Sequence, residues 1–235
     1  MELQNTEENM DLQLEDRVIL VVGGRGLIGS AVVDLLRKEG AIAIPASRST
    51  TEGVQLDASQ DDSVAEAVAT VLERHGRIDG LVVAAAPAAG TLDSSTDSDP
   101  AEILKALDAK ALTFLRVAKA VVPAMQDAGY GRVVGVSGQN AFLTGSMTGS
   151  MRNAALIVAA KNLADTLAGT GVSVNTVSPG PVTTEPSAAV EIGKPGESSP
   201  EDVANLILYL VSPLAGAVSG ESIAVGHRVR GVTAF

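Results

Sequence analysis

Short runs of β-branched residues alternate with longer stretches rich in Ala and Leu along most of the chain. The short runs are apolar at successive positions, which is typical of strands buried on both faces, whereas the longer stretches have helical periodicity. The predicted strands are residues 18–22, 41–44, 80–84, 132–136, 172–177 and 222–225. This alternation predicts an α/β fold with one doubly wound parallel sheet.

Two of the predicted helices begin with capping residues. The first has a cap, a first-turn proline, a capping-box acid and a terminating glycine, at Asp99, Pro100, Glu102 and Gly129. This pattern predicts one long helix that ends near residue 128. The second helix repeats the first three features at Ser199, Pro200 and Asp202, and an apolar stripe at helical spacing follows.

Two segments fall outside the alternation. Residues 1–15 carry acidic side chains and no basic one, which predicts a disordered acidic leader before a single domain over residues 16–235. Residues 183–199 are rich in Pro, Gly, Ser and Glu and follow a late strand. Because open α/β sheets bind ligands beyond the carboxyl ends of their strands, this segment is predicted to be a short substrate lid.

Composition and charge remove several classes of function. The 235-residue chain has no Cys, two His and a formal net charge of −11. The absence of Cys excludes disulfides, thiolate zinc sites and cysteine nucleophiles, and two His disfavour a His-rich metal site. Basic residues are not clustered for nucleic acid, and no apolar run is long enough to cross a membrane. The leader lacks the basic start and apolar core of a secretion signal, so we expect a cytoplasmic protein without a metal site.

The predicted strand 18–22 runs into a glycine-rich turn that leads into a helix. Gly24, Gly26 and Gly29 fit the dinucleotide fingerprint, in which glycines allow a tight turn, close approach of pyrophosphate and close helix packing. The helix N-terminus supplies amide donors to the anion. The predicted cofactor-binding residues here are Gly23, Gly24, Arg25, Gly26, Leu27, Ile28 and Gly29. A purely structural turn is the alternative, but the strand and helix around it favour a Rossmann-type nucleotide site.

The residues after the second predicted strand bear on the choice of nucleotide. A protein that binds NAD normally has an acid there for the ribose 2′-hydroxyl. This chain has Ser47 and Arg48 instead. Together with Arg25, Arg48 could hold a 2′-phosphate, because a guanidinium matches phosphate oxygens. NADP(H) is therefore favoured over NAD(H), unless both arginines are only solvated surface residues.

Further motifs follow along the chain: Leu56-Asp57-Ala58, Ile78-Asp79-Gly80-Leu81-Val82-Val83, Gly131-Arg132-Val133-Val134, the run from Gly171 through Pro179-Gly180-Pro181-Val182-Thr183-Thr184, and Ser219-Gly220-Glu221-Ser222-Ile223-Ala224-Val225. With the glycine loop, they make residues 16–225 resemble the short-chain dehydrogenase/reductase family. The glycine spacing is similar to that of extended and atypical members. The length and the Pro179-Gly180 segment are similar to those of classical members.

The resemblance implies nucleotide contacts at several positions. In that family the acid at the Asp57 position meets the adenine amino group, the backbone near Val182 contacts the nicotinamide carboxamide, and a hydroxyl at the Thr184 position assists. The cofactor-binding residues implied in this way are Asp57, Ala58, Ala84, Ala85, Ala86, Pro179, Gly180, Val182 and Thr184. The family's Asn-Asn-Ala-Gly segment is replaced here by Val83-Ala84-Ala85-Ala86.

The family reduces carbonyls or oxidises alcohols with a Tyr, a Lys, a Ser and an Asn, and this chain departs from that pattern. The positions expected for Tyr, Lys and Asn carry Gly149, Asn153 and Lys110, and the Ser falls at or beside Gly138, next to Ser137. No Tyr lies between Tyr130 and Tyr209, and both are expected to be packing residues.

Lys110 therefore lies at the position where the family has its Asn, and Asn153 lies at the position where the family has its Lys. If both face the cleft, a desolvated Lys110 could act as an acid/base or electrostatic group, and Ser137 could orient a carbonyl oxygen. The catalytic candidates are Ser137, Lys110 and Asn153. The alternative, favoured by the usual exposure of charged helix residues, is a solvated Lys110 and an interface Asn153. Arg152 could receive an anionic substrate or face a partner subunit.

These observations predict an NADP(H)-dependent oxidoreductase with a non-standard active site that acts on a small carbonyl, enone or alcohol. Two alternatives are a nucleotide-binding sensor or scaffold without redox activity, and a lyase, isomerase or cyclase, because a fold does not fix a function. The resemblance further implies a homodimer or homotetramer, formed through the Ala-rich helix over residues 154–168 and the long helix before Gly129.

Overall fold

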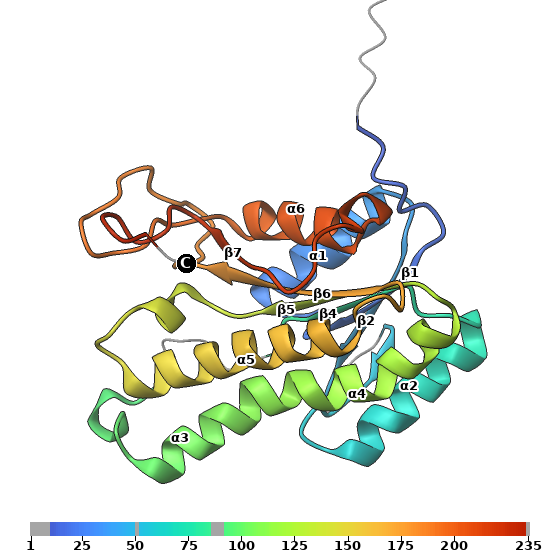
Figure 1. The fold of residues 1–235 in the computed structure, drawn as a ribbon, viewed down its shortest axis with the longest axis horizontal. Coiled ribbons are helices and arrows are strands. Elements are labelled where there is room, and N and C mark those ends of the chain that lie inside the picture. The colour runs from blue at the N-terminus through green and yellow to red at the C-terminus, as the bar shows by residue number, and fades with distance from the viewer. Residues whose placement is uncertain (1–9, 50–51, 86–91, 234–235) are drawn as a thin grey trace, which may run out of the picture.

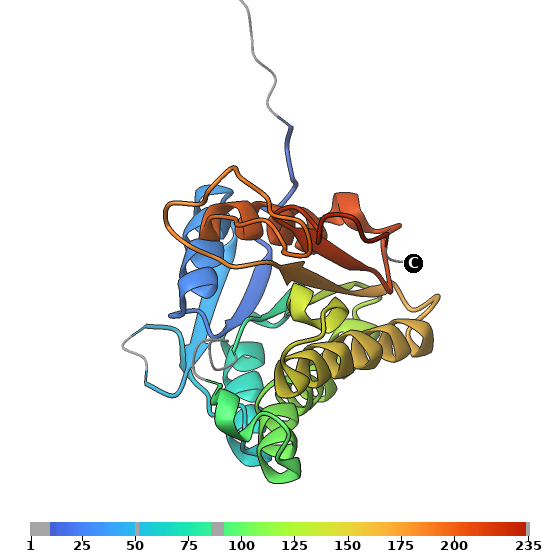
Figure 2. The same ribbon diagram turned by 90° about the vertical axis from the view of Figure 1, so that its left-hand side faces the viewer.

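The computed structural model describes residues 10–49, 52–85 and 92–233, which form a parallel sheet between two layers of helices (Figures 1 and 2). The sheet has seven strands in the order β3-β2-β1-β4-β5-β6-β7. Their bounds are β1 Val18–Val22, β2 Ile42–Ser47, β3 Val54–Gln55, β4 Gly80–Val83, β5 Gly131–Val136, β6 Val172–Pro179 and β7 Ser222–Val225. The predicted single Rossmann-type domain is confirmed.

Helices cover both faces of the sheet (Figure 1). Helices α1 (Leu27–Lys38) and α6 (Pro200–Val211) pack together on one face. The other face carries α2 (Asp61–His75), α4 (Thr113–Asp127) and α5 (Met147–Thr166), with α3 (Pro100–Leu107) leading into α4. Short helical segments lie at Ser94–Thr96, Gln139–Phe142 and Pro213–Ala215. Each face of the sheet therefore has its own apolar core.

The strand pattern arises from burial on both faces. Every residue of β1, β4, β5 and β6 is buried, as the continuous apolar runs predict. Strand β3 was not predicted, because two residues with one buried side chain, Val54, carry no readable periodicity. Strand β6 runs two residues beyond its predicted end, to Pro179. It therefore ends directly at the segment that the family resemblance connects with nicotinamide.

The order of strands reverses beside β1. Strand β1 pairs with β2 on one side and with β4 on the other, both in parallel. The loops that leave the carboxyl ends of these strands therefore diverge and leave a crevice between them. The glycine loop, Arg48 after β2 and Ala84 and Ala85 after β4 all lie at this edge, so the fold brings these predicted cofactor-binding residues together.

The long helix predicted before Gly129 is not continuous. Residues Asp108–Leu112 form a π-helical segment between α3 and α4, and the Thr113 amide donates to the Asp108 carbonyl five residues earlier. Asp99 caps α3 by accepting from the Ala101 amide, but Glu102 pairs with Lys105 and does not act as the predicted capping-box acid. The predicted cap of α6 is confirmed, since Ser199 and Asp202 form a complete capping box.

The packed part of the chain begins before the predicted domain boundary at residue 16. Leu14, inside the predicted leader, is only 1% exposed and belongs to the core beneath α1 and α6. Its apolar side chain is held by the hydrophobic effect although its neighbours are acidic. Residues 1–9 of the predicted leader lie outside the described residues.

The segment between β6 and α6 is tied down at two places. Val182 bridges Ser198 within the segment, and Ile192 bridges Arg230 in the C-terminal tail. The Gly196 amide also donates to the His227 carbonyl at 2.7 Å. The predicted lid over residues 183–199 is therefore attached to the tail rather than standing alone.

No helix in residues 10–49, 52–85 and 92–233 is long and apolar enough to cross a membrane. Within the same ranges, no group of three or more His, Asp or Glu residues is placed to hold a metal ion.

Candidate functional site

A cavity of about 460 Å³ lies at the crevice beside β1. Eight residues that the sequence predicts to bind a cofactor line it: Gly23, Gly26, Ser47, Arg48, Asp57, Ala58, Ala84 and Ala85. They come from the ends of β1, β2 and β4 and from the segment after β3. Segments far apart in the sequence thus meet around one cavity at the carboxyl edge of the sheet.

Three glycines of the loop are required by packing. Gly23 has φ of +83° and lies against the Ala84–Ala85 backbone. A Cβ on Gly29 would lie 2.1 Å from the Gly23 carbonyl oxygen, and one on Gly24 would lie 2.8 Å from the Pro45 Cβ. These contacts hold the first turn of α1 against β1 and leave no space for side chains.

Gly26 differs from the other three glycines. Its φ of −77° suits any residue, and an added Cβ would meet only the Gly23 oxygen, at 3.3 Å. Gly26 lines the cavity and is the N-cap of α1, and neither a side-chain cap nor a first-turn acid covers that end of the helix. An uncapped helix N-terminus with its partial positive charge is a good site for pyrophosphate. The residues present therefore fit a dinucleotide.

The other residues of the loop lie outside this cavity. Gly24 and Arg25 line a separate hollow of about 350 Å³, next to Arg37 and Glu52. The Arg25 guanidinium donates to the Ser49 carbonyl at 2.7 Å, so it supports the loop after β2. Leu27 and Ile28 occupy the first turn of α1, and Ala86 lies outside the described residues. Of the two predicted phosphate-binding arginines, only Arg48 lines the cavity beside β1, which is called the nucleotide cavity below.

Asp57 presents a charged carboxylate at the same cavity. Its Oδ1 accepts hydrogen bonds from the Ser59 hydroxyl at 2.7 Å and from the Ser59 amide at 3.0 Å. These bonds lower the pKa of Asp57, and the charge of Arg48 lowers it further. An ionised acceptor at this position suits an amino group such as that of adenine.

The residues implied for the nicotinamide end lie beyond β6. The Gly180 amide donates to the Val225 carbonyl at 3.1 Å, and a Cβ on Gly180 would lie 2.2 Å from the Gly196 oxygen. Val182 takes part in the bridge to Ser198, while Thr184 is exposed. Pro179, Gly180, Val182 and Thr184 do not line the cavity that holds the other predicted residues.

Lys110 is buried, which corrects the expectation of a solvated helix residue. It lies in the π-helical segment and is only 7% exposed. Its Nζ donates to the Ser137 carbonyl at 3.0 Å, at the end of β5. Burial lowers the Lys110 pKa to about 7, and the nearby charge of Arg152 adds to the effect. Lys110 can therefore gain or lose a proton near neutral pH.

Ser137 and Asn153 belong to the same network. The Ser137 hydroxyl donates to the Asn153 carbonyl at 3.0 Å, and Asn153 Nδ2 donates to the Gly149 carbonyl at 2.8 Å. The buried Asn153 Oδ1 has no hydrogen-bond partner among the described residues. Asn153 is thus an interior residue, not an interface one, and the structure brings the three catalytic candidates together.

The position expected for the family's Tyr is crowded by the side chain that caps α5. A Cβ on Gly149 would lie 2.8 Å from the hydroxyl of Ser146, which caps α5 by accepting from the Gly149 amide. Tyr130 is held between the guanidiniums of Arg17 and Arg132, at 4.5 and 4.4 Å from its ring centre, before β5 begins. Tyr209 lies on α6. Neither Tyr supplies a phenol to the network.

Six residues that line the cavity are not among the predicted ones: Val22, Ala46, Leu56, Ser59, Ala109 and Thr113. Ala109 and Thr113 line the nucleotide cavity from either side of Lys110 in the chain. The sequence offered one signal for these two residues: they lie four apart on a predicted helix, and therefore on one face of it, and they flank Lys110. The π-helical turn brings this part of the helix toward the sheet edge, which helical periodicity alone does not predict.

The chain is similar to known proteins over most of its length. A family model described as enoyl-(acyl carrier protein) reductase matches residues 28–227. The chain is 26% identical to the 3-oxoacyl-(acyl-carrier-protein) reductase FabG of Vibrio cholerae, over 91% of this chain and 97% of that protein. It is 30% identical to dehydrogenase/reductase SDR family member 4 of Homo sapiens, over 91% and 87% of the two chains.

A solved structure has the same fold. The crystal structure of gox2181 superposes with a TM-score of 0.79 at 24% identity, and the match covers 92% of this chain and 96% of that one. The family model and the relatives show that the chain belongs to the short-chain dehydrogenase/reductase family. The relatives just described are oxidoreductases by name.

The glycine loop gives a first prediction, from a matched pair of variants. Gly26→Ala should fold normally but bind NADPH at least about tenfold more weakly, because its methyl group adjoins the pyrophosphate position. Gly29→Ala should instead lower the free energy of unfolding, because its methyl group overlaps the Gly23 carbonyl. Urea unfolding and titration of NADPH fluorescence measure the two effects. Equal NADPH affinity of Gly26→Ala and wild type would contradict the assignment.

The burial of Lys110 gives a second prediction. Because its pKa falls from 10.5 to about 7 on folding, the unfolded chain binds more protons than the folded one between these values. Stability from this group is therefore lost as pH falls toward 7. Relative to Lys110→Met, the wild-type free energy of unfolding should rise by roughly 3 kcal/mol from about pH 7 to about pH 9.5. Denaturant unfolding at several pH values tests this, with Lys105→Met as the control, and a constant difference would refute it.

Proposed function

We propose that this protein is an NADP(H)-dependent oxidoreductase that acts on a small carbonyl, enone or alcohol through a non-standard active site. The observation that carries the proposal is the cavity at the uncapped N-terminus of α1, lined by Gly26 and Arg48. The catalytic candidates lie near the carboxyl end of β5, where Lys110 Nζ donates a hydrogen bond to the Ser137 carbonyl.

Arg48 supports NADP(H) over NAD(H). It follows β2, lines the cavity with Ser47, and stands where an NAD-binding protein would carry an acid. Its guanidinium can bind a 2′-phosphate through two parallel hydrogen bonds, whereas an acid would repel that phosphate. Arg25 contributes indirectly in this proposal, because it fixes the Ser49 carbonyl of the loop that carries Arg48.

The protein's own residues would manage the proton and the carbonyl. Bound NADPH would supply hydride to the substrate. Lys110, with a pKa of about 7, can hold the proton that a reduced oxygen needs at neutral pH. The Ser137 hydroxyl now donates to a backbone carbonyl and could donate to a substrate oxygen instead. The Asn153 carbonyl would hold the Ser137 hydroxyl in the free protein and release it when the substrate oxygen takes its place.

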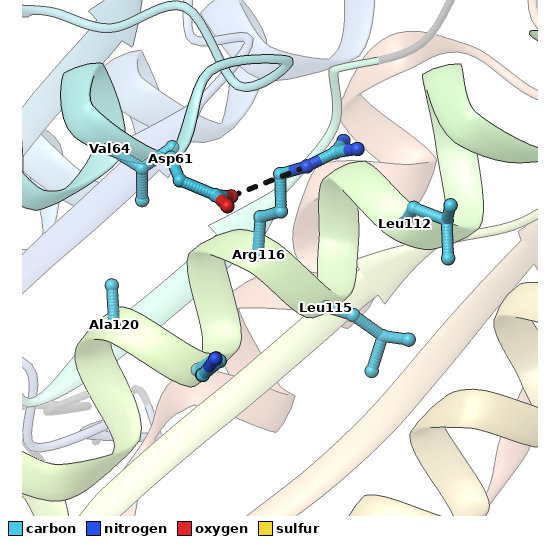
Figure 3. Close-up of a pocket in the computed structure, with 7 residues that line it drawn as sticks. Asp61, Val64, Leu112, Leu115, Arg116 and Ala120 are labelled. Atoms are coloured by element: carbon cyan, nitrogen blue, oxygen red, sulfur yellow. Dashed lines mark ion pairs between the residues drawn. The ribbon is translucent and has the colours of Figure 1, made fainter.

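The helical face opposite α1 and α6 supports assembly into a homodimer or homotetramer. Leu112, Met151 and Val158 expose large apolar side chains on this face. A hollow of about 460 Å³ lies on this face, and within it the Asp61 carboxylate is 3.4 Å from Arg116 Nε. Figure 3 shows this ion pair together with Leu112 and Leu115, which also line the hollow. Apolar side chains of this size are usual in contacts between subunits. The proposed partners of this protein are therefore a second copy of the chain and a small-molecule substrate.

A non-redox function is favoured by one observation, the replacement of the family's Tyr and Lys by Gly149 and Asn153. A lyase, isomerase or cyclase could use Lys110 as its acid and base without net change in the nucleotide. A sensor or scaffold would bind NADPH and convert no substrate. The two experiments below separate these cases, because they measure binding, nucleotide consumption and substrate conversion independently.

Nucleotide preference is the third prediction. Titration of NADPH and NADH fluorescence at fixed salt should show tighter binding of NADPH. Arg48→Ala should weaken NADPH at least about tenfold and NADH by no more than about twofold, since only the 2′-phosphate contact is lost. Arg74→Ala, an exposed arginine on α2, is the control. Equal affinities for both nucleotides would remove the basis for NADP(H), and absence of binding would remove the oxidoreductase proposal.

Turnover is the fourth prediction. With NADPH and a panel of carbonyls and enones, Lys110→Met and Ser137→Ala should each lower turnover by about 100-fold, the usual contribution of a positioned proton donor. Their NADPH dissociation constants should stay within about threefold of wild type, because neither residue lines the nucleotide cavity. Unchanged turnover in both variants would refute the proposed site. Substrate conversion without loss of NADPH absorbance would assign the non-redox function.

A further inference from the structure

A cavity of about 440 Å³ lies at the amino ends of β5 and β6. Its walls come from the first residues of these two strands, from the end of α5 and from the turn before β7. The nucleotide cavity lies at the carboxyl ends of the strands, and the two cavities share no lining residue. A ligand in this amino-end cavity would therefore not displace a nucleotide.

Arg132, at the start of β5, places a buried cation in the amino-end cavity. It is only 7% exposed, and Tyr130 stacks against its guanidinium. Its Nε donates to the Ser212 carbonyl at 3.4 Å, and its Nη1 donates to the carbonyls of Gly131 and Gly171 at 2.8 and 3.0 Å. Within the described part of the chain, no carboxylate pairs with Arg132 and its Nη2 makes no hydrogen bond. Since an Arg stays charged, two of its N–H donors remain for a ligand.

The acids at this end of the sheet pair with other cations. Asp79, just before β4, pairs with both Arg17 and Arg77. Asp165, which lines the amino-end cavity, pairs with Lys161 on the same face of α5. Neither acid therefore neutralises the buried guanidinium, and a buried charge without a counterion is costly.

Two hydroxyl groups and one glycine complete the polar side of the cavity. Ser173 is only 3% exposed, and its Oγ has no hydrogen-bond partner among the described residues. The Ser219 Oγ accepts from the Val174 amide at 3.2 Å, which leaves its hydrogen for another acceptor. Gly216 has φ of −58°, which suits any residue, but an added Cβ would lie 3.0 Å from Arg132 Nη2. Its lack of a side chain keeps the space beside Nη2 open.

We propose that the amino-end cavity binds the phosphate group of a small anion through Arg132 Nη2 and the hydroxyls of Ser173 and Ser219. The cavity presents donors from three separate segments of the chain, and a phosphate group has enough oxygens to accept from each. The volume exceeds that of one phosphate ion, so a phosphorylated metabolite fits as well as inorganic phosphate. The proposal does not depend on the proposed function.

Isothermal titration calorimetry at fixed ionic strength tests the site, with inorganic phosphate, glycerol 3-phosphate and acetate as probes. Inorganic phosphate should bind saturably in the millimolar range or below, and acetate at least about tenfold more weakly. Tighter binding of glycerol 3-phosphate than of inorganic phosphate would identify a phosphate ester as the ligand, and the reverse order would identify the free ion. Absence of saturable binding, or equal binding of acetate, would overturn the proposal.

A pair of buried serines attributes the binding to this cavity. Ser173→Ala should weaken phosphate at least about tenfold without lowering the urea midpoint of unfolding, because the lost hydroxyl has no partner in the free protein. Ser198→Ala removes another buried serine hydroxyl that has no partner among the described residues, and should change the phosphate affinity by no more than about twofold. A purely structural role of Ser173 predicts equal affinities in the two variants.

Gly216→Ala provides a second, independent variant. Its methyl group would occupy the space beside Arg132 Nη2 and should also weaken phosphate at least about tenfold, while the helical backbone of Gly216 accepts an Ala. Equal phosphate affinities of wild type, Ser173→Ala and Gly216→Ala would refute the site.

The nucleotide cavity is another place where phosphate can bind, so the titrations are repeated with saturating NADPH and with the Arg48→Ala variant. Phosphate affinity should stay within about twofold of wild type in both, because neither change touches the amino-end cavity. If the protein binds no NADPH, the Arg48→Ala titration still tests the site, so failure of the proposed function leaves this inference testable. Loss of phosphate binding in either titration would assign the ion to the nucleotide cavity and overturn the proposal.

Discussion

The close contact between the start of α1 and the end of β1 is the constraint on which the site depends. The Gly23 carbonyl occupies the space that any side chain on Gly29 would need, so the helix can meet the strand this closely only with glycine at position 29. This contact places the uncapped end of α1 at the crevice where the strand order reverses. Ser47 and Arg48 at the end of β2 and Ala84 and Ala85 after β4 line the cavity around it.

Positive charge is concentrated in the interior of a protein whose overall charge is negative. The chain carries a formal net charge of −11, yet its crevice is lined by the amide end of α1 and by Arg48, with Lys110 and Arg152 buried nearby. Positive groups at one end of a cleft concentrate the field there, while the Asp57 carboxylate lines another part of the same cavity. The phosphates of a nucleotide would be drawn to the amide end of α1 and to Arg48, while the acidic exterior disfavours polyanions such as nucleic acid.

Features that depend on neighbouring residues in the chain could be predicted from the sequence. Features that depend on the rotation of a helix or on the path of a loop could not. The glycine loop was readable because a strand precedes it and a helix follows, and the cap at Ser199 was readable from three neighbouring residues. The burial of Lys110 was not, because a helical pattern does not reveal a single π-helical turn. Arg25 and Arg48 looked equivalent in the sequence, and only the path of the loop after β2 separates them. Leu14 shows that one buried apolar residue can extend a domain into an acidic segment.

The π-helical segment has a consequence for how this chain tolerates changes in length. Such a turn is equivalent to one extra residue within an α-helix, and each residue advances the helix by about 100°. Deleting one residue from Asp108–Leu112 would restore regular hydrogen bonding and leave α3 and α4 in nearly the same relative orientation, because the bulge alone absorbs the extra residue. Helix α3 would therefore keep the row of side chains that it packs against α5. A single-codon deletion here would keep the packing of both helices and still take Lys110 away from the end of β5.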